Sequence, residues 1–397
     1  MRKTTVYSAA PLLLLLILML WIPSTALAEE EKVSHETAQK AVEADLAGMN
    51  SEHEFYAQWQ GAKVEYEREL YDLEDAVIGY YFLLKLDTET VGYYVTSART
   101  DLPPILEYGI ESEFVETKNN ERIYYFGGSG SIAGRDSAEV IAAIGDRVES
   151  RNEAIATEEK GDFSNSRSAQ AQATAASEQQ GLDEVVASLE LDADPNATSH
   201  WEELLNPPQG ITIAALPETY KLNVPFIYQR MAGITGPGSA CGPTTLAMIL
   251  EYLGDQGLDV EDARYYNNSI VNLVNGNRNI MSTGVFGTTS GNMVFGLNNT
   301  LRPGWTITSI NADSSGAIEK YKSRIVSGRP PALMWDKLVL FPWTDAQLKW
   351  HWQAGSAYTY SGSSFMFGVK DPDRDATTRY YNWNSNQSGF LFISYAK

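Results

Sequence analysis

The chain has 397 residues, of which 43% are hydrophobic and 11% aromatic, and this is enough apolar material for two or three globular domains. Its 30 Lys and Arg residues against 51 Asp and Glu residues give a formal net charge of −21, which argues against a protein that binds nucleic acid through a basic face. A single cysteine, Cys241, excludes an intramolecular disulfide scaffold and a cysteine-rich metal site.

The first residues have the features of an export signal. Arg2 and Lys3 precede an apolar run of about eleven residues, 12–22, and Ala26-Leu27-Ala28 then offers small residues at the positions that a signal peptidase needs. The run is shorter than the roughly 20 residues that a membrane-spanning helix needs, and an uncleaved anchor is the alternative. We expect residues 1–28 to be a signal peptide, the mature protein to be secreted or at the cell surface, and membrane contact to be limited to export.

Residues 29–135 have the pattern of a small α+β domain. Ser34 is placed to cap a helix that ends near Gly48. Segments rich in Tyr, Val, Ile and Phe, separated by acidic or Gly-containing turns, predict strands at 63–71, 77–86 and 91–96. Pro103 and Pro104 must then leave the sheet, because proline cannot donate a ladder hydrogen bond.

Residues 136–215 are predicted to be a flexible linker with short helices. Between 151 and 180 the large apolar side chains are Ile155 and Phe163, and most other residues are Ala, Ser, Gln, Glu and Thr. Such a composition cannot bury enough surface to offset the entropy of ordering. A short helix is expected at 182–191.

Residues 216–397 are predicted to form a second domain, which holds six of the nine tryptophans. A helix comes first and apolar strands follow, which indicates an α+β fold. Cys241 follows a glycine-rich loop, 233–238, and precedes a helix that Pro243 can begin. Helix N-termini favour anions and offer N–H groups to a developing oxyanion, so Cys241 is a candidate nucleophile, with a buried structural cysteine as the alternative.

A thiolate needs a base or cationic partner. The chain has four histidines, and His351 is the one that falls in the same predicted domain as Cys241. A packed structural histidine beside tryptophans is the alternative reading. A third group usually orients the imidazole, and Asp371 follows a predicted strand, 365–370, that can lie next to the His351 strand. Other candidates for this role are Asp373, Asp375 and Asn382.

Several of these segments resemble the C39-like branch of papain-fold cysteine peptidases. The resemblance rests on Leu222-Asn223-Val224-Pro225, Gln229, Ala240-Cys241-Gly242-Pro243-Thr244-Thr245-Leu246-Ala247-Met248, His351 and Asp371-Pro372. It implies a papain-like domain in which a helix carries Cys241 and an antiparallel sheet carries His351 and Asp371. It also implies that Gln229 supplies an oxyanion-hole donor. The chain departs from the family after His351, where Trp352-Gln353-Ala354-Gly355-Ser356-Ala357-Tyr358 replaces the usual aliphatic run and Gly-Tyr pair.

The predicted N-terminal domain has a weaker similarity of its own. Residues 91–98 and 102–108 are similar to a motif of streptopain-like pro-regions. The similarity implies an inhibitory or chaperone-like pro-domain, and a small extracellular binding module is the alternative.

The sequence therefore predicts a secreted thiol hydrolase that cleaves an amide bond of a peptide or protein. Neither a cofactor nor a metal is expected. Asp371-Pro372-Asp373-Arg374-Asp375 resembles a calcium loop but lacks the Gly at position 6 and the terminal Glu of an EF-hand. The alternatives are a non-catalytic extracellular binding module on a papain-like scaffold and a related transferase or amidase that acts on cell-wall peptides.

Overall fold

A computed structural model of the chain describes residues 32–110, 117–118, 120–158, 181–206, 219–284, 287–336, 340 and 351–397. The predicted signal peptide and the middle of the predicted linker lie outside these ranges. Among the described residues, no helix is both long enough and apolar enough to cross a membrane.

The N-terminal region combines two helices with six strands, which are paired mostly antiparallel. Its helices and strands are α2 (His35–Gly48), α3 (Tyr56–Trp59), β1 (Lys63–Tyr71), β2 (Val77–Leu86), β3 (Glu89–Ser97), β4 (Ile105–Gly109), β5 (Arg122–Tyr125) and β6 (Ser131–Gly134). The Ser34 side chain caps α2 by accepting a hydrogen bond from the backbone N–H of Thr37 at 3.3 Å. Pro103 and Pro104 lie between β3 and β4, outside the ladder, as predicted.

The segment predicted as a linker contains more regular structure than short helices. Its described residues form α4 (Ser137–Glu158), α6 (Leu182–Ser188) and α7 (Ala197–Leu205). The long helix α4 has apolar residues four apart, Val140, Ile144 and Val148, which are buried together with Val185 of α6. The linker prediction rested on the polar composition of 151–180. The apolar stripe lies before that stretch, in the first turns of the helix.

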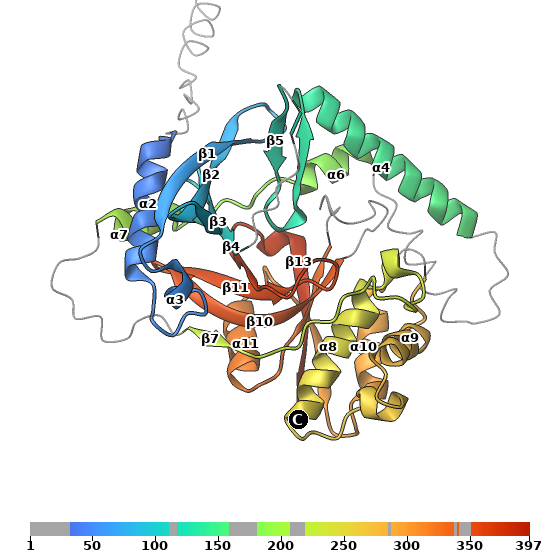
Figure 1. Cartoon of the computed structure of the whole chain (residues 1–397). Coiled ribbons are helices and arrows are strands. Elements are labelled where there is room, and N and C mark those ends of the chain that lie inside the picture. Colours follow the sequence, from blue (N-terminus) through green and yellow to red (C-terminus); the bar gives the residue numbers. More distant parts are fainter. Residues whose placement is uncertain are drawn as a thin grey trace, which may run out of the picture. The chain divides into compact units, whose positions relative to one another are not determined.

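The C-terminal region begins with helices and ends with strands, as the sequence indicates. Its elements are β7 (Tyr220–Lys221), α8 (Cys241–Asp255), α9 (Ile270–Ile280), α10 (Ser290–Thr300), β8 (Thr306–Asn311), α11 (Ala317–Val326), β9 (Ala332–Trp335), β10 (His351–Ser361), β11 (Ser364–Lys370), β12 (Arg379–Asn382) and β13 (Phe390–Ala396). The helices α8, α9 and α10 lie together beside the C-terminal strands, and α8 packs against β9 and β10 (Figure 1). The predicted α+β class is confirmed.

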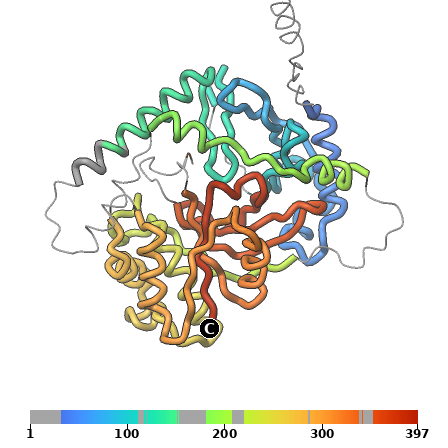
Figure 2. Tube along the Cα trace, turned by 180° about the vertical axis from the view of Figure 1, so that it is seen from behind, coloured from blue at the N-terminus to red at the C-terminus, as the bar shows by residue number. Residues whose placement is uncertain are grey.

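One sheet runs through both regions. Within the described residues its strand order is β6-β5-β1-β2-β3-β4-β12-β11-β10-β9-β13-β8, and β7 pairs with β10. The two regions meet where β4 pairs antiparallel with β12, with Tyr108 opposite Tyr380 and Glu107 opposite Tyr381. Figure 2, seen from behind, shows the blue and cyan N-terminal part of the trace next to the red C-terminal part. Residues 32–397 accordingly form one compact unit, and not two units joined by a tether.

Candidate active site

Cys241 is the first residue of α8, as the sequence predicts. A tight turn precedes Cys241. Gly236 has a left-handed backbone conformation with φ of 56°, and it leads into a single 3-10 turn, Pro237–Ser239. The N-cap residue, Ala240, makes no side-chain hydrogen bond to the first N–H groups of the helix. Gly242 packs so closely that a Cβ there would overlap the Thr288 side chain. Cys241 itself is fully buried.

His351 is the first residue of β10 and is also fully buried. Its Nε2 lies 2.9 Å from Oδ1 of Asp371, the residue that directly follows β11. Because β10 and β11 are antiparallel neighbours, the start of one strand lies beside the end of the other. This pairing brings together two residues that are 20 positions apart in the sequence.

The two side chains form a charged pair. Burial alone would lower the pKa of His351, but the charge and hydrogen bond of Asp371, together with a hydrogen bond and a charge interaction with Cys241, raise it well above its ordinary value of 6.5. Burial would likewise raise the pKa of Asp371, but His351 and the hydrogen bonds from Asp373 and Gln353 outweigh it and lower that pKa. The structure thus brings Cys241, His351 and Asp371 together.

The other three candidates for orienting His351 are engaged elsewhere. Asp373 forms a two-pronged ion pair with Arg230, at 2.5 and 2.9 Å. Asp375 accepts a hydrogen bond from the Thr377 backbone at 2.6 Å, and the Asn382 amide donates to the carbonyl of Ile105 at 3.2 Å. Burial raises the pKa of Asp373 to about 6, although the hydrogen bond from Arg230 opposes that rise.

Gln229 is fully buried between the two halves of the site. Its Nε2 donates to the carbonyl of Pro237 at 2.9 Å, in the loop that leads to Cys241. Its backbone N–H donates to the carbonyl of Pro372 at 2.7 Å, next to Asp371. Gln229 therefore fastens the loop before α8 to the turn after β11, and the second hydrogen of its amide is not needed for the Pro237 bond.

Sequence reasoning missed two residues of the site, Trp335 and Gln353. Gln353 Nε2 donates to Asp371 Oδ2 at 3.0 Å, and its Oε1 accepts from Trp335 Nε1 at 2.8 Å. One signal could have identified Gln353, because residues two apart on a strand share a face and Gln353 follows His351 by two. Nothing in the sequence connects Trp335 to Gln353, since their contact depends on the pairing of β9 with β10.

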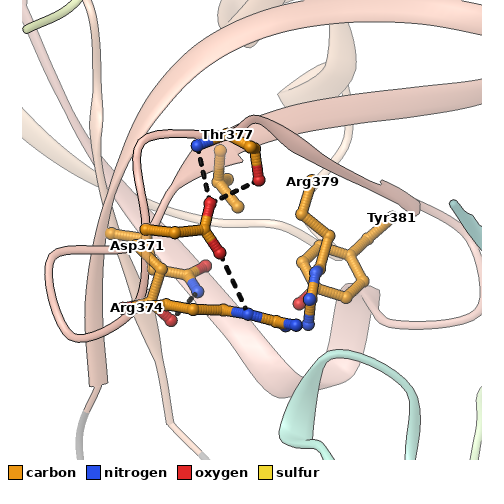
Figure 3. Close-up of a pocket in the computed structure, with 8 residues that line it drawn as sticks. Asp371, Arg374, Thr377, Arg379 and Tyr381 are labelled. Atoms are coloured by element: carbon orange, nitrogen blue, oxygen red, sulfur yellow. Dashed lines mark hydrogen bonds and ion pairs between the residues drawn. The ribbon is translucent and has the colours of Figure 1, made fainter. Parts of the chain in front are cut away.

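A small pocket lies behind Asp371 (Figure 3). It is lined by Gln353, Val369, Asp371, Arg374, Asp375, Thr377, Arg379 and Tyr381. Figure 3 shows the side chains of Arg374 and Arg379 extending toward one another beside Tyr381. Arg379 belongs to β12, the strand that joins the two regions, so the pocket connects the site with that junction.

The model of the family described as Peptidase_C39 like matches residues 221–395, a range that contains Gln229, Cys241, His351 and Asp371. A comparison of the chain with curated proteins finds no match.

Proposed function

We propose that this protein is a cysteine peptidase that hydrolyses an amide bond of a peptide or protein with Cys241, His351 and Asp371, because residues 221–395 match the model of the family described as Peptidase_C39 like. The observation that carries the proposal is the contact of His351 with both Cys241 and Asp371, together with the raised pKa of the imidazole. A protonated His351 beside the sulfur stabilises the thiolate, which is the nucleophilic form.

The reaction follows from the positions of these side chains. The Cys241 thiolate attacks the carbonyl carbon, and the imidazolium of His351 gives its proton to the leaving amine as the C–N bond breaks. The resulting thioester is hydrolysed by water, which loses a proton to neutral His351, and the thiolate leaves with the imidazolium restored. Since Nε2 of His351 is held by Asp371, Nδ1 is the nitrogen that serves the sulfur. Asp371 orients the ring and stabilises its charge.

Two donors are available for the tetrahedral oxyanion. One is the backbone N–H of Cys241 at the N-terminus of α8, and the other is the second amide hydrogen of Gln229. Each donor of this kind contributes about 2.7–4 kcal/mol to the stability of the transition state in comparable sites.

One observation favours a second candidate function, a non-catalytic binding module on the same scaffold. Cys241 and His351 are both fully buried, so a substrate reaches the sulfur only after part of the chain moves. A module that kept the scaffold for binding has no need of such an opening, and it would tolerate the replacement Cys241→Ser.

Hydrolysis of a peptide library by the purified protein separates the two candidates. We expect Cys241→Ala to lower turnover by a factor on the order of 10⁴ or more while circular dichroism shows an unchanged fold. Thr245→Val is the matched control, since it lies one turn along the same helix and removes a buried hydroxyl that has no hydrogen-bond partner among the described residues, and it should stay active. Activity that survives in Cys241→Ala would contradict the proposal.

The reaction class and the location are part of the same proposal. We propose hydrolysis, in which water takes the acyl group of the thioester. An amidase acting on cell-wall peptides would do the same on another substrate, whereas a related transferase would pass the acyl group to an amine. Addition of a free amino acid ester separates them, because a transferase would yield an amide of that amine.

Export predicts that the mature protein begins near Glu29, which N-terminal sequencing of the secreted form tests.

A further inference from the structure

The turn between β5 and β6 reaches the candidate active site from the N-terminal module, by which we mean the described residues of 32–158. This turn contains Gly127, Gly128 and Ser129. A Cβ at Gly128 would come within 2.5 Å of Trp335 Cζ3 and closer still to two other ring atoms, so the backbone lies flat against the indole. The N–H of Gly128 also donates to Asn386 Oδ1 at 2.8 Å. Only a glycine fits at this position without moving Trp335.

A second contact fastens the same turn to the chain that precedes His351. The N–H of Leu340 donates to the carbonyl of Ser129 at 2.7 Å, and Leu340 forms a parallel bridge with Gly130. The Leu340 side chain is buried in the core of the N-terminal module, against Tyr124, Phe126, Ile132, Val140 and Ile144 among others. The module therefore holds the polypeptide on the C-terminal side of Trp335 as well as its ring.

From Trp335 a directed chain of hydrogen bonds leads to His351. The indole N–H can only donate, so Gln353 must turn its carbonyl oxygen toward Trp335 and its NH₂ group toward Asp371. Asp371 Oδ2 accepts from Gln353 at 3.0 Å, which leaves Oδ1 for Nε2 of His351 at 2.9 Å. If the indole shifted, the Gln353 amide could turn over and present its oxygen to a carboxylate, which is repulsive.

We infer that Gly128 and Gln353 are positioning residues, and that the N-terminal module is a permanent part of the catalytic centre that holds Asp371, and through it His351, in the working orientation. This inference rests on the proposed function of Cys241 and His351. It differs from the pro-domain that the sequence similarity implies, since a module that supports Asp371 raises activity while bound.

The test compares two glycine substitutions in the N-terminal module of the full-length protein. Gly128→Ala forces the Trp335 ring to move, whereas Gly48→Ala is the matched control, with no atom within 4 Å of the added Cβ. We expect Gly128→Ala to lower kcat at least tenfold with little change in KM. The alkaline limb of kcat/KM should move to lower pH, because a displaced Asp371 holds the imidazolium proton less firmly. Gly48→Ala should match the wild type in kcat, KM and pH profile.

Variants of Gln353 keep the test informative even if Gly128→Ala does not fold. Gln353→Leu removes both hydrogen bonds of the amide, and it should reproduce the lower kcat and the shifted alkaline limb. Gln353→Glu can still accept from Trp335 but cannot donate to Asp371, so it should not rescue activity. If Gly128 acts through Gln353, the double variant Gly128→Ala/Gln353→Leu should be no slower than the slower single variant.

Wild-type kcat and an unmoved alkaline limb in Gln353→Leu would overturn the inference, as would losses in the double variant that multiply. These outcomes are distinct from failure of the proposed function. Activity that survives in Cys241→Ala refutes the proposed function itself, whereas an inactive Cys241→Ala beside a fully active Gln353→Leu refutes only the positioning role.

Discussion

Each oxygen of the Asp371 carboxylate has a defined partner. Oδ1 accepts from the backbone N–H of Asp373 at 2.8 Å and lies 2.9 Å from His351 Nε2, while Oδ2 accepts from Gln353. Three hydrogen-bonding contacts in a buried setting keep the carboxylate ionised, and its charge keeps the imidazole protonated. The protonation state of His351 at neutral pH thus depends on whether both oxygens of Asp371 keep their hydrogen-bond partners.

The variant Asp371→Asn tests this coupling. It removes the charge that raises the pKa of His351, so the imidazolium should lose its proton at lower pH and the alkaline limb of kcat/KM should move down. Loss of a charged hydrogen-bond partner costs about 1.5–3 kcal/mol, which corresponds to roughly a 10- to 100-fold lower kcat. An alkaline limb that stays in place would show that Asp371 does not set the state of the ring.

The same pKa shifts determine how the free energy of unfolding changes with pH. The pKa of His351 is raised in the folded state, so its contribution is fully present below pH 6.5 and is lost as pH rises through the raised pKa. The pKa of Asp371 is lowered, so its contribution is present above pH 3.8 and is lost as pH falls through the lowered pKa. Urea unfolding should therefore show the largest difference between wild type and Asp371→Asn in the intervening range.

At the scale of elements, the site depends on how the segment 222–231 is fastened to the loop between β11 and β12. Gln229 bonds to Pro372, and the next residue, Arg230, holds Asp373 in an ion pair. The Asp373 side chain is completely buried, whereas Arg230 is 26% exposed. The segment that carries Gln229, the proposed oxyanion donor, is thereby fixed to the turn that carries Asp371, the carboxylate proposed to orient His351.

Arg230→Met leaves the Asp373 carboxylate buried without its counter-charge. We expect destabilisation of up to about 3–5 kcal/mol near pH 8. Because burial already raises the pKa of Asp373 to about 6, and loss of Arg230 raises it further, protonation should relieve most of this cost near pH 5. Urea unfolding at the two pH values checks it, and an equal loss of stability at both would contradict this view of the pair.

At the scale of the whole molecule, β4 and β12 join the two regions through a buried polar cluster. Glu107 of β4 accepts hydrogen bonds from Tyr93 at 2.5 Å and Tyr125 at 2.9 Å, and it lies 3.6 Å from Arg379 of β12. Tyr108 and Tyr380 stack across the same junction with ring centroids 5.0 Å apart. Separation of the regions would break the Glu107–Arg379 contact, the stack of Tyr108 on Tyr380 and the β4–β12 pairing at once, so it is opposed.

Proteolysis of the segment 159–180 tests this continuity. The two fragments should co-elute on size exclusion and unfold in one transition, and activity should not change, because the N-terminal module stays in the sheet. A catalytic fragment that separates and gains activity would instead support the inhibitory pro-domain that residues 91–98 and 102–108 suggest.

Local patterns predicted the elements well, and long-range contacts set the limits of prediction. The strands at 63–71 and 77–86 and the start of α8 at Cys241 follow from alternation, glycine placement and Pro243, which act over a few residues. The partnership of His351 with Asp371 was also accessible, because each lies at the end of a predicted strand. The β4–β12 pairing and the Gly128–Trp335 contact join residues more than 200 positions apart, and no local pattern encodes them.

Alkylation tests whether Cys241 is a nucleophilic thiolate held by His351. Native protein is treated with iodoacetamide at neutral pH, and the adduct is located by peptide mass spectrometry, with urea-unfolded protein as the reference for an accessible thiol. We expect a single adduct on Cys241 in the native protein, formed when part of the chain moves and opens the buried site, and formed more slowly in Asp371→Asn. Native protein that never labels, while the unfolded chain labels fully, would contradict it.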